Sequence, residues 1–268
     1  MIGAARLSRL AAIAALVVVD LATPAGAASP GAESPACTDR AAALARLPLP
    51  LARMHRLVTS RRPLTVMALG SSSTAGAGAS SEAASYPMRL QAYLRQRFPG
   101  IVITVVNRGV NGEDAAEMLR RFDLAALSDT PDVVLWQFGT NTVLRDDRSD
   151  TARLITEGLL RMRALGADVV LIDPQFAPTV LAKGDAAEHM VGVIAAASRN
   201  RGVDLFPRFR VMREWHDAEA IPFDAFLDPD RLHMNDWGYA CFARLLGAAM
   251  AEAATRPVTS GPAVTPER

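Results

Sequence analysis

Continuous apolar runs of strand length alternate along most of the chain with longer segments in which apolar residues recur at every third or fourth position. Runs without polar alternation are typical of strands buried on both faces of a parallel sheet. The pattern predicts an α/β domain with three layers, α/β/α, around a mainly parallel sheet of about five strands. Asp114 and Asp185 are the expected N-cap residues of two helices. The predicted strands are LTVMALG (64–70), IVITVVN (101–107), DVVLWQFG (132–139), DVVLID (168–173) and GVDLF (202–206), and the predicted helices cover 86–97, 114–127, 151–165, 186–200 and 236–254.

The N-terminal segment does not follow this alternation. Two arginines precede an apolar run over residues 10–19, and the small residues Ala-Gly-Ala at 25–27 offer a cleavage site. This layout is typical of a secretory signal peptide. A membrane anchor is the alternative, but the run is shorter than the ~20 apolar residues of a membrane span, and Asp20 ends it. We therefore expect residues 1–27 to be a signal peptide and the mature protein to be periplasmic or secreted.

Length and charge limit the class of protein. A chain of 268 residues suits one large domain, which we expect over residues 28–255. The net charge of +1 and the lack of a basic cluster give no long-range field toward nucleic acid or an anionic membrane. Residues 256–268 are rich in Pro, Ser, Thr and Gly, and we expect them to form a disordered tail.

The chain has two cysteines, Cys37 and Cys241. In an oxidising compartment such a pair can form a disulfide, here between the start of the mature chain and a C-terminal helix. Two buried thiols packed as small apolar side chains are the alternative. The sequence leaves both possibilities open.

Polar or glycine-rich loops follow four of the predicted strands. They are Ser-Ser-Ser-Thr at 71–74, Arg-Gly-Val-Asn-Gly at 108–112, Thr-Asn at 140–141 and Pro-Gln at 174–175. In a doubly wound sheet these loops emerge at the same edge, where ligands bind. We therefore expect hydroxyl groups, a glycine turn and an amide to meet in one crevice. The small residues that follow the serines would let a turn expose one of the hydroxyls.

The serine-rich stretch does not match three common glycine motifs. A P-loop needs a lysine after its second glycine, but Ala77 follows Gly76. A dinucleotide fingerprint would need a glycine at Ser81, and the G-x-S-x-G elbow would need one at Thr74. No cluster has metal-ligand spacing, so we expect neither a cofactor nor a metal.

A serine nucleophile needs a base, and the chain has four histidines. His55 precedes the first strand, His189 lies within a predicted helix, and His216 has no partner motif. His233 differs from these, because Asp230 stands three residues before it in an irregular segment ahead of the last helix. This spacing can bring a carboxylate and an imidazole together across one turn.

Taken together, these blocks resemble the SGNH (GDSL-type) hydrolases, a family named for Ser, Gly, Asn and His in four separated blocks. The blocks read LGSSSTAG, NRGVNG, GTN and DRLHMNDWGY, in the order of the family, between positions 70 and 239. The resemblance implies a flavodoxin-like fold with Ser72 as the nucleophile. It assigns Gly109 to the second block and Asn141 to the third. Asp230 and His233 belong to the last block.

One position departs from the family pattern. The family has an acidic residue before the serine nucleophile, and this chain has Ser71. Because that acidic residue takes no part in proton transfer, we expect the change to alter how the serine loop is held more than it alters the chemistry.

Elementary chemistry gives each of these groups a role. His233 can accept the proton of Ser72, because an imidazole titrates near neutral pH, and Asp230 would fix its tautomer. Attack on an ester creates an oxyanion, which needs preorganised donors. The main-chain N–H groups of Ser72 and Gly109 and the side-chain amide of Asn141 are the expected donors.

We therefore expect an exported serine ester hydrolase that works through an acyl-enzyme on O-acetyl or other short acyl esters of carbohydrates. Its partner would be a small-molecule or polysaccharide ester. One alternative is an O-acyltransferase with the same acyl-enzyme, and another is a glycan-binding protein on an inactive hydrolase scaffold. Gln175, Arg108 and Arg145 stand beside the crevice, and we expect them to be solvated loop residues or members of surface ion pairs. Trp215 is expected to pack in the core.

Overall fold

The structure is a computed structural model that describes residues 37, 39–147 and 149–256. The expected signal peptide at 1–27 and nearly all of the expected tail at 256–268 lie outside these residues. The helices are α1 (Asp39–Leu44), α2 (Ala52–Thr59), α3 (Ser72–Ala75), α4 (Tyr86–Arg97), α5 (Ala115–Asp129), α6 (Thr140–Leu144), α7 (Thr151–Ala164), α8 (Pro178–Leu181), α9 (Asp185–Arg201), α10 (Arg208–Arg213), α11 (Phe223–Phe226) and α12 (Asp236–Thr255), with a 3-10 turn at Glu82–Ala84 and a π turn at Glu214–Ala218.

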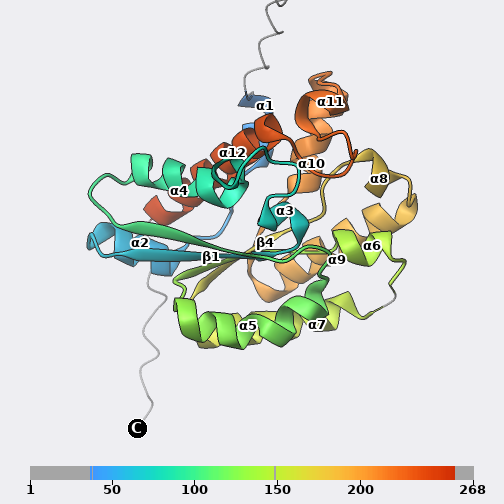
Figure 1. Cartoon of the computed structure of the whole chain (residues 1–268). Coiled ribbons are helices and arrows are strands. Elements are labelled where there is room, and N and C mark those ends of the chain that lie inside the picture. The colour runs from blue at the N-terminus through green and yellow to red at the C-terminus, as the bar shows by residue number, and fades with distance from the viewer. Residues whose placement is uncertain (1–36, 38, 148, 257–268) are drawn as a thin grey trace, which may run out of the picture. The chain divides into compact units, whose positions relative to one another are not determined.

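Five parallel strands form one sheet in the order β2-β1-β3-β4-β5 (Figure 1). Most of their side chains are buried, as the continuous apolar runs predict. The predicted fold class, a three-layer α/β/α domain around a five-stranded parallel sheet, is confirmed. The strands are β1 (Leu64–Gly70), β2 (Ile103–Gly109), β3 (Val133–Gln137), β4 (Asp168–Ile172) and β5 (Asp204–Phe206).

Strand β2 starts and ends two residues later than the apolar run IVITVVN indicates. The reason is register, since Ile103 pairs with Leu64 and Gly109 pairs with Gly70. Residue Gly109, expected in a loop, is therefore the last residue of a strand beside the end of β1.

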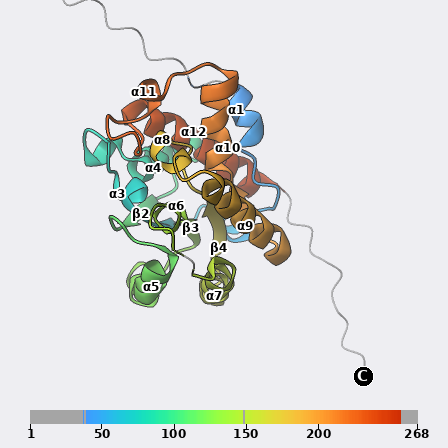
Figure 2. The same ribbon diagram turned by 90° about the vertical axis from the view of Figure 1, so that its right-hand side faces the viewer.

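Helices cover both faces of the sheet (Figure 1). Helices α4 and α12 pack together on one face, and α5 and α7 pack together on the other. Figure 2 looks onto the end of the sheet where α3, α6 and α8 lie close together. These three short helices begin within a few residues after β1, β3 and β4, so they mark the C-terminal edge of the sheet.

Helix α5 begins as the sequence predicts, and α9 does not. The Asp114 side chain accepts a hydrogen bond from the N–H of Glu117, and the Glu117 side chain accepts one from the N–H of Asp114, which forms a capping box. Asp185 is the first helical residue of α9, and its N-cap is Gly184, with φ of 58°. The prediction for Asp185 is thus wrong by one position, although a carboxylate in the first turn still favours the helix dipole.

A disulfide joins Cys37 to Cys241, with their α-carbons 5.4 Å apart. It ties the segment before α1 to the second turn of α12, so the possibility of a bridge between the two ends of the domain is confirmed. None of the helices in the described part of the chain is both long enough and apolar enough to cross a membrane.

Candidate active site

The serine-rich segment turns sharply from β1 into α3, and it exposes one serine of three. Ser71 and Ser73 are each 2% exposed, whereas Ser72 is partly exposed at the first position of α3. A buried hydroxyl cannot meet a substrate, so the fold presents the oxygen of Ser72 alone.

Ser72, His233 and Asp230 form one hydrogen-bonded row at this edge of the sheet. Nε2 of His233 lies 2.7 Å from Oγ of Ser72, and Nδ1 lies 2.5 Å from Oδ2 of Asp230. The structure thus brings together three residues that are separated by up to 161 positions in sequence. A carboxylate can only accept, so Nδ1 carries the hydrogen and Nε2 is free to accept the hydrogen bond of the Ser72 hydroxyl.

The loop around Asp230 keeps this carboxylate charged. Partial burial acts to raise the pKa of Asp230, but hydrogen bonds from the His233 side chain and from the N–H groups of His233 and Leu232 outweigh it and lower the pKa. Both N–H groups donate to Oδ1 over 2.9 Å, which leaves Oδ2 for the imidazole. The D-x-x-H spacing therefore works because one turn folds the aspartate back onto the histidine.

The small residues after Ser72 let two loops approach closely. Gly78 has φ of 84°, and a Cβ built on it would lie 2.5 Å from the carbonyl oxygen of Met234 and 3.0 Å from Cβ of His233. The hydroxyl of Tyr239 donates to the carbonyl of Ala77 over 2.6 Å. The segment that follows the serine thus packs directly against the histidine loop, and a side chain at Gly78 would separate them.

The N–H of Gly109 is not available to an oxyanion, which corrects the sequence prediction. It donates to Oδ1 of Asn107 over 2.9 Å. A Cβ built on Gly109 would lie 2.1 Å from the main-chain nitrogen of Ala75. The glycine is needed because the end of β2 packs against α3, so its role is close packing.

The sequence analysis assigned no role to the second glycine of the same block, Gly112. Its φ is 80°, and no hydrogen bond in the described part of the chain uses its N–H. The amide nitrogen of Asn141 donates over 2.8 Å to the carbonyl of Glu113, the residue that follows Gly112. Asn141 therefore lies at the turn that contains Gly112. Both glycines stand in NRGVNG, and spacing alone does not tell which one packs.

Gln137 holds the start of α3, a role that the sequence analysis did not predict. Its Oε1 accepts hydrogen bonds from the N–H of Ser71 (3.0 Å), the hydroxyl of Ser71 (3.1 Å) and the hydroxyl of Thr74 (3.1 Å). All three residues are buried. Gln137 thus holds Ser71, the residue before Ser72, by contacts between neutral groups. The GDSL pattern has an acidic residue at the position of Ser71.

A second buried polar cluster supports the loop after β4. Gln175 is 2% exposed and accepts hydrogen bonds from the Thr140 hydroxyl over 2.9 Å and from Arg208 over 2.8 Å. The interpretation of Gln175 as a solvated residue is therefore wrong. Burial raises the pKa of Asp173 to about 7 and lowers that of Arg208 to about 10.

The two other residues beside the crevice form ion pairs, as expected. Arg108 contacts Asp129 over 2.6 Å, and Arg145 contacts Asp114 and Glu117 over 3.3 Å. The remaining expectations concern an aromatic residue and the other histidines. Trp215 is fully buried, His189 is exposed, His55 contacts the carbonyl of Ala254, and His216 contacts the carbonyl of Ile221.

Across the described ranges, no group of three His, Cys, Asp or Glu side chains could hold a metal ion. The three groups at the sheet edge could act as a hydroxyl nucleophile, a general base and an orienting carboxylate.

A row of serine, histidine and aspartate at the C-terminal edge of a parallel sheet is the arrangement found in serine hydrolases, a class that includes esterases and proteases. The chain belongs to the non-GDSL lipase-like family, whose sequence profile matches residues 36–256, more than half of the chain. A comparison with curated proteins finds no match.

Several solved structures share the fold. A two-domain esterase active on acetylated mannans, co-crystallised with mannopentaose, has 23% sequence identity and a TM-score of 0.65 over 82% of this chain and 58% of that chain. A catalytic mutant of an acetylxylan esterase from Geobacillus stearothermophilus has 16% identity and a TM-score of 0.60, over 70% of this chain and 94% of that one. A lipase/acylhydrolase from Enterococcus faecalis has 21% identity and a TM-score of 0.54, over 70% and 96%. The chain thus spans little more than half the length of the mannan esterase.

Proposed function

We propose that the protein is an exported serine hydrolase of the SGNH type that removes O-acetyl or other short acyl groups from carbohydrates. The observation that carries this proposal is the row of Ser72, His233 and Asp230, with Ser72 as the exposed hydroxyl of three. Membership in a lipase-like family supports ester hydrolysis.

The row supports a two-step reaction through an acyl-enzyme. As Oγ of Ser72 forms a bond to the acyl carbon, its proton passes to Nε2 of His233. The bond to the alcohol oxygen then breaks, and that oxygen takes the proton from Nε2. In the second step a water gives its proton to Nε2 and its oxygen to the acyl carbon, and Ser72 leaves with the proton. Asp230 stays ionised throughout and stabilises the imidazolium.

The developing oxyanion needs donors that are already in place. We assign these to the N–H of Ser72, the N–H of Gly112 and the side-chain amide of Asn141. Gly112 replaces Gly109 because the N–H of Gly109 is already bonded to Asn107. One hydrogen of the Asn141 amide is held by the carbonyl of Glu113, which fixes the group and leaves its second hydrogen free to donate.

Two independent observations support the location and the substrate class. The disulfide between Cys37 and Cys241 is typical of an oxidising compartment, which agrees with a secretory signal peptide. Among the solved structures of the same fold are esterases that act on acetylated mannans and acetylxylan. Acetylated polysaccharides outside the cytoplasm would be accessible to an exported esterase.

The test is a panel of esters, from aryl acetates to long acyl chains and acetylated polysaccharides, with the purified mature chain. We expect hydrolysis of acetyl esters and covalent labelling by a fluorophosphonate, both lost in Ser72→Ala and kept in the neighbouring control Ser73→Ala. A wild-type chain that neither turns over nor labels would favour a glycan-binding scaffold. Transfer of the acyl group to an added sugar, in place of release as free acid, would favour an acyltransferase.

A further inference from the structure

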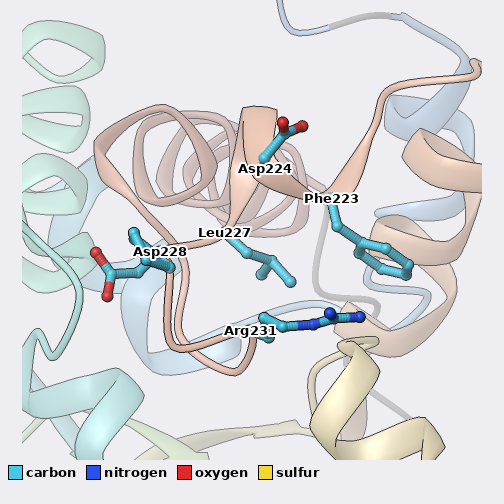
Figure 3. Close-up of a pocket in the computed structure, with 6 residues that line it drawn as sticks. Phe223, Asp224, Leu227, Asp228 and Arg231 are labelled. Carbon is cyan, nitrogen blue, oxygen red and sulfur yellow. The ribbon is translucent and has the colours of Figure 1, made fainter.

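A pocket of 470 Å³ lies along the segment that leads to His233 (Figure 3). Its volume is within the range of roughly 300–1,000 Å³ that is common for small-molecule sites. All of its lining residues come from one short segment, so we call it the 223–231 pocket. The lining residues are Phe223, Asp224, Leu227, Asp228, Pro229 and Arg231.

An aromatic ring in a fixed position forms one wall of the 223–231 pocket. The ring of Phe223 stacks on that of His216, with centroids 3.8 Å apart and planes at 24°. His216 is held in turn by the carbonyl of Ile221, 3.1 Å from its Nδ1. Phe226 packs against Phe223 as well, with centroids 5.5 Å apart. Because Phe223 is held and still partly exposed, it can serve as a rigid platform for an apolar face of a ligand.

Charged groups with unused hydrogen-bonding capacity line the rest of the pocket. In the described part of the chain, neither the guanidinium of Arg231 nor the carboxylate of Asp228 makes an ion pair or a side-chain hydrogen bond. In Figure 3 the Phe223 ring and the Arg231 guanidinium lie on the same side of the pocket, and the Asp228 carboxylate points away from both. The main chain of Arg231 is fixed, since its carbonyl accepts from the N–H and the hydroxyl of Thr179.

The pocket and the proposed general base belong to one turn. The N–H of Asp228 donates to the carbonyl of His233 over 2.8 Å, and Leu227 pairs with Met234 in an antiparallel bridge. Arg231 is two residues from His233, so their α-carbons lie within about 7 Å of each other. A ligand seated in the 223–231 pocket would therefore contact the turn that carries His233.

We propose that the 223–231 pocket binds a neutral pyranose ring of the acylated carbohydrate, which rests on the proposed esterase function. A pyranose has an apolar face of C–H groups that can stack on Phe223 and a rim of hydroxyls that can bond to the neighbouring guanidinium of Arg231. An acyl chain would fit poorly, because it would desolvate the charged groups of the pocket without replacing their hydrogen bonds. A strongly charged sugar would meet groups of both signs, which favours a neutral ring.

Kinetic discrimination between two substrates tests the proposal. For Phe223→Leu we expect the ratio of kcat/KM for an acetylated neutral oligosaccharide to that for an aryl acetate to fall about tenfold, mostly through KM. Phe223→Tyr should restore the ratio, because it keeps the ring. Arg231→Ala should lower the ratio as well, and the exposed, distant Arg62→Ala should leave it as in the wild type. An unchanged ratio in Phe223→Leu and Arg231→Ala would overturn the proposal, as would a selective loss of long-chain aryl esters.

A binding measurement separates this proposal from the esterase function. Titration of unacetylated mannooligosaccharide and xylooligosaccharide into Ser72→Ala should show saturable binding by calorimetry, at least for one of the two. The double variant Ser72→Ala, Phe223→Leu should bind at least about tenfold more weakly. No binding, or binding of equal strength in both variants, would overturn the pocket assignment. Failure of the wild type to hydrolyse any ester would instead overturn the proposed function.

Discussion

At the scale of single residues, the site depends on which of several similar side chains has no other partner. The Ser71 hydroxyl is hydrogen-bonded to Gln137 and Ser73 is buried, so Ser72 carries the hydroxyl that is partly exposed. The same reasoning separates Gly109, whose N–H is bonded to Asn107, from Gly112. It separates His233, which contacts both a hydroxyl and a carboxylate, from the other histidines.

Asn141 gives the sharpest prediction at this scale. We expect Asn141→Ala to lower kcat by about 10²–10³-fold with a much smaller change in KM, because the amide in its proposed role would act on charge that exists only in the transition state. Steady-state kinetics with an aryl acetate measures this. Asn111→Ala is the matched control, since Asn111 is an exposed asparagine of the neighbouring turn. A raised KM with normal kcat would make Asn141 a substrate-binding residue.

At the scale of elements, the strands could be predicted from sequence and the short helices could not. A strand buried on both faces leaves a continuous apolar run, and β1 was predicted residue for residue. Helices such as α3 and α6 have four and five residues, too few to show a period, and tertiary contacts hold them in place. The role of Gln137, at the end of the apolar strand β3, could not be predicted for a similar reason. Its hydrogen bonds are to Ser71 and Thr74, which approach it only in the folded chain.

The contact between β3 and α3 can be tested through Gln137. Gln137→Leu leaves three buried donors without their acceptor, and each unsatisfied group costs about 1–3 kcal/mol. We expect a large loss in the free energy of unfolding, measured by urea denaturation, and lower kcat in the fraction that folds. Ser71→Ala removes one donor together with its bond and should cost only about 1 kcal/mol. Gln96→Ala, on the exposed face of α4, should change neither quantity.

At the scale of the whole molecule, buried carboxyl groups make stability depend on pH. Burial raises the pKa of Asp173 to about 7 and that of Asp204 to about 6. A raised pKa means that the folded protein holds the proton more tightly than the unfolded chain, whose aspartates titrate near 3.9. The contribution of these two carboxyl groups to the free energy of unfolding is therefore fully present below about pH 4, and it is lost as the pH rises toward 7.

We therefore expect the free energy of unfolding to be lower at pH 8 than at pH 5. One pKa unit corresponds to about 1.4 kcal/mol, so the difference should be of the order of a few kcal/mol. Asp173→Asn should flatten the profile, and the exposed Asp123→Asn should keep it. Chemical denaturation at the two pH values measures this difference. If the free energy of unfolding changes equally with pH in the wild type and in Asp173→Asn, then Asp173 is not the group responsible.

The disulfide supplies the second prediction at this scale. It closes a loop between positions 204 residues apart, which restricts the unfolded chain strongly. Cys37→Ser with Cys241→Ser should lower the free energy of unfolding by about 2–4 kcal/mol. The residues of the proposed site are not part of the bridge, so kcat at low temperature should stay close to that of the wild type. A double variant as stable as the oxidised wild type would show that the bridge does not restrain the unfolded chain.

The distance of 161 residues between Ser72 and His233 along the chain has a consequence for the timing of activity. A ribosome makes the serine early and the histidine late, and His233 stands just before α12, the last helix described. A chain that is incomplete, or still threaded through a membrane pore with its C-terminal part behind, contains a hydroxyl but no base beside it. Under the proposed function, the chain therefore has no esterase activity until its synthesis has passed His233, and a stop codon at or before position 233 yields a fragment that is catalytically silent.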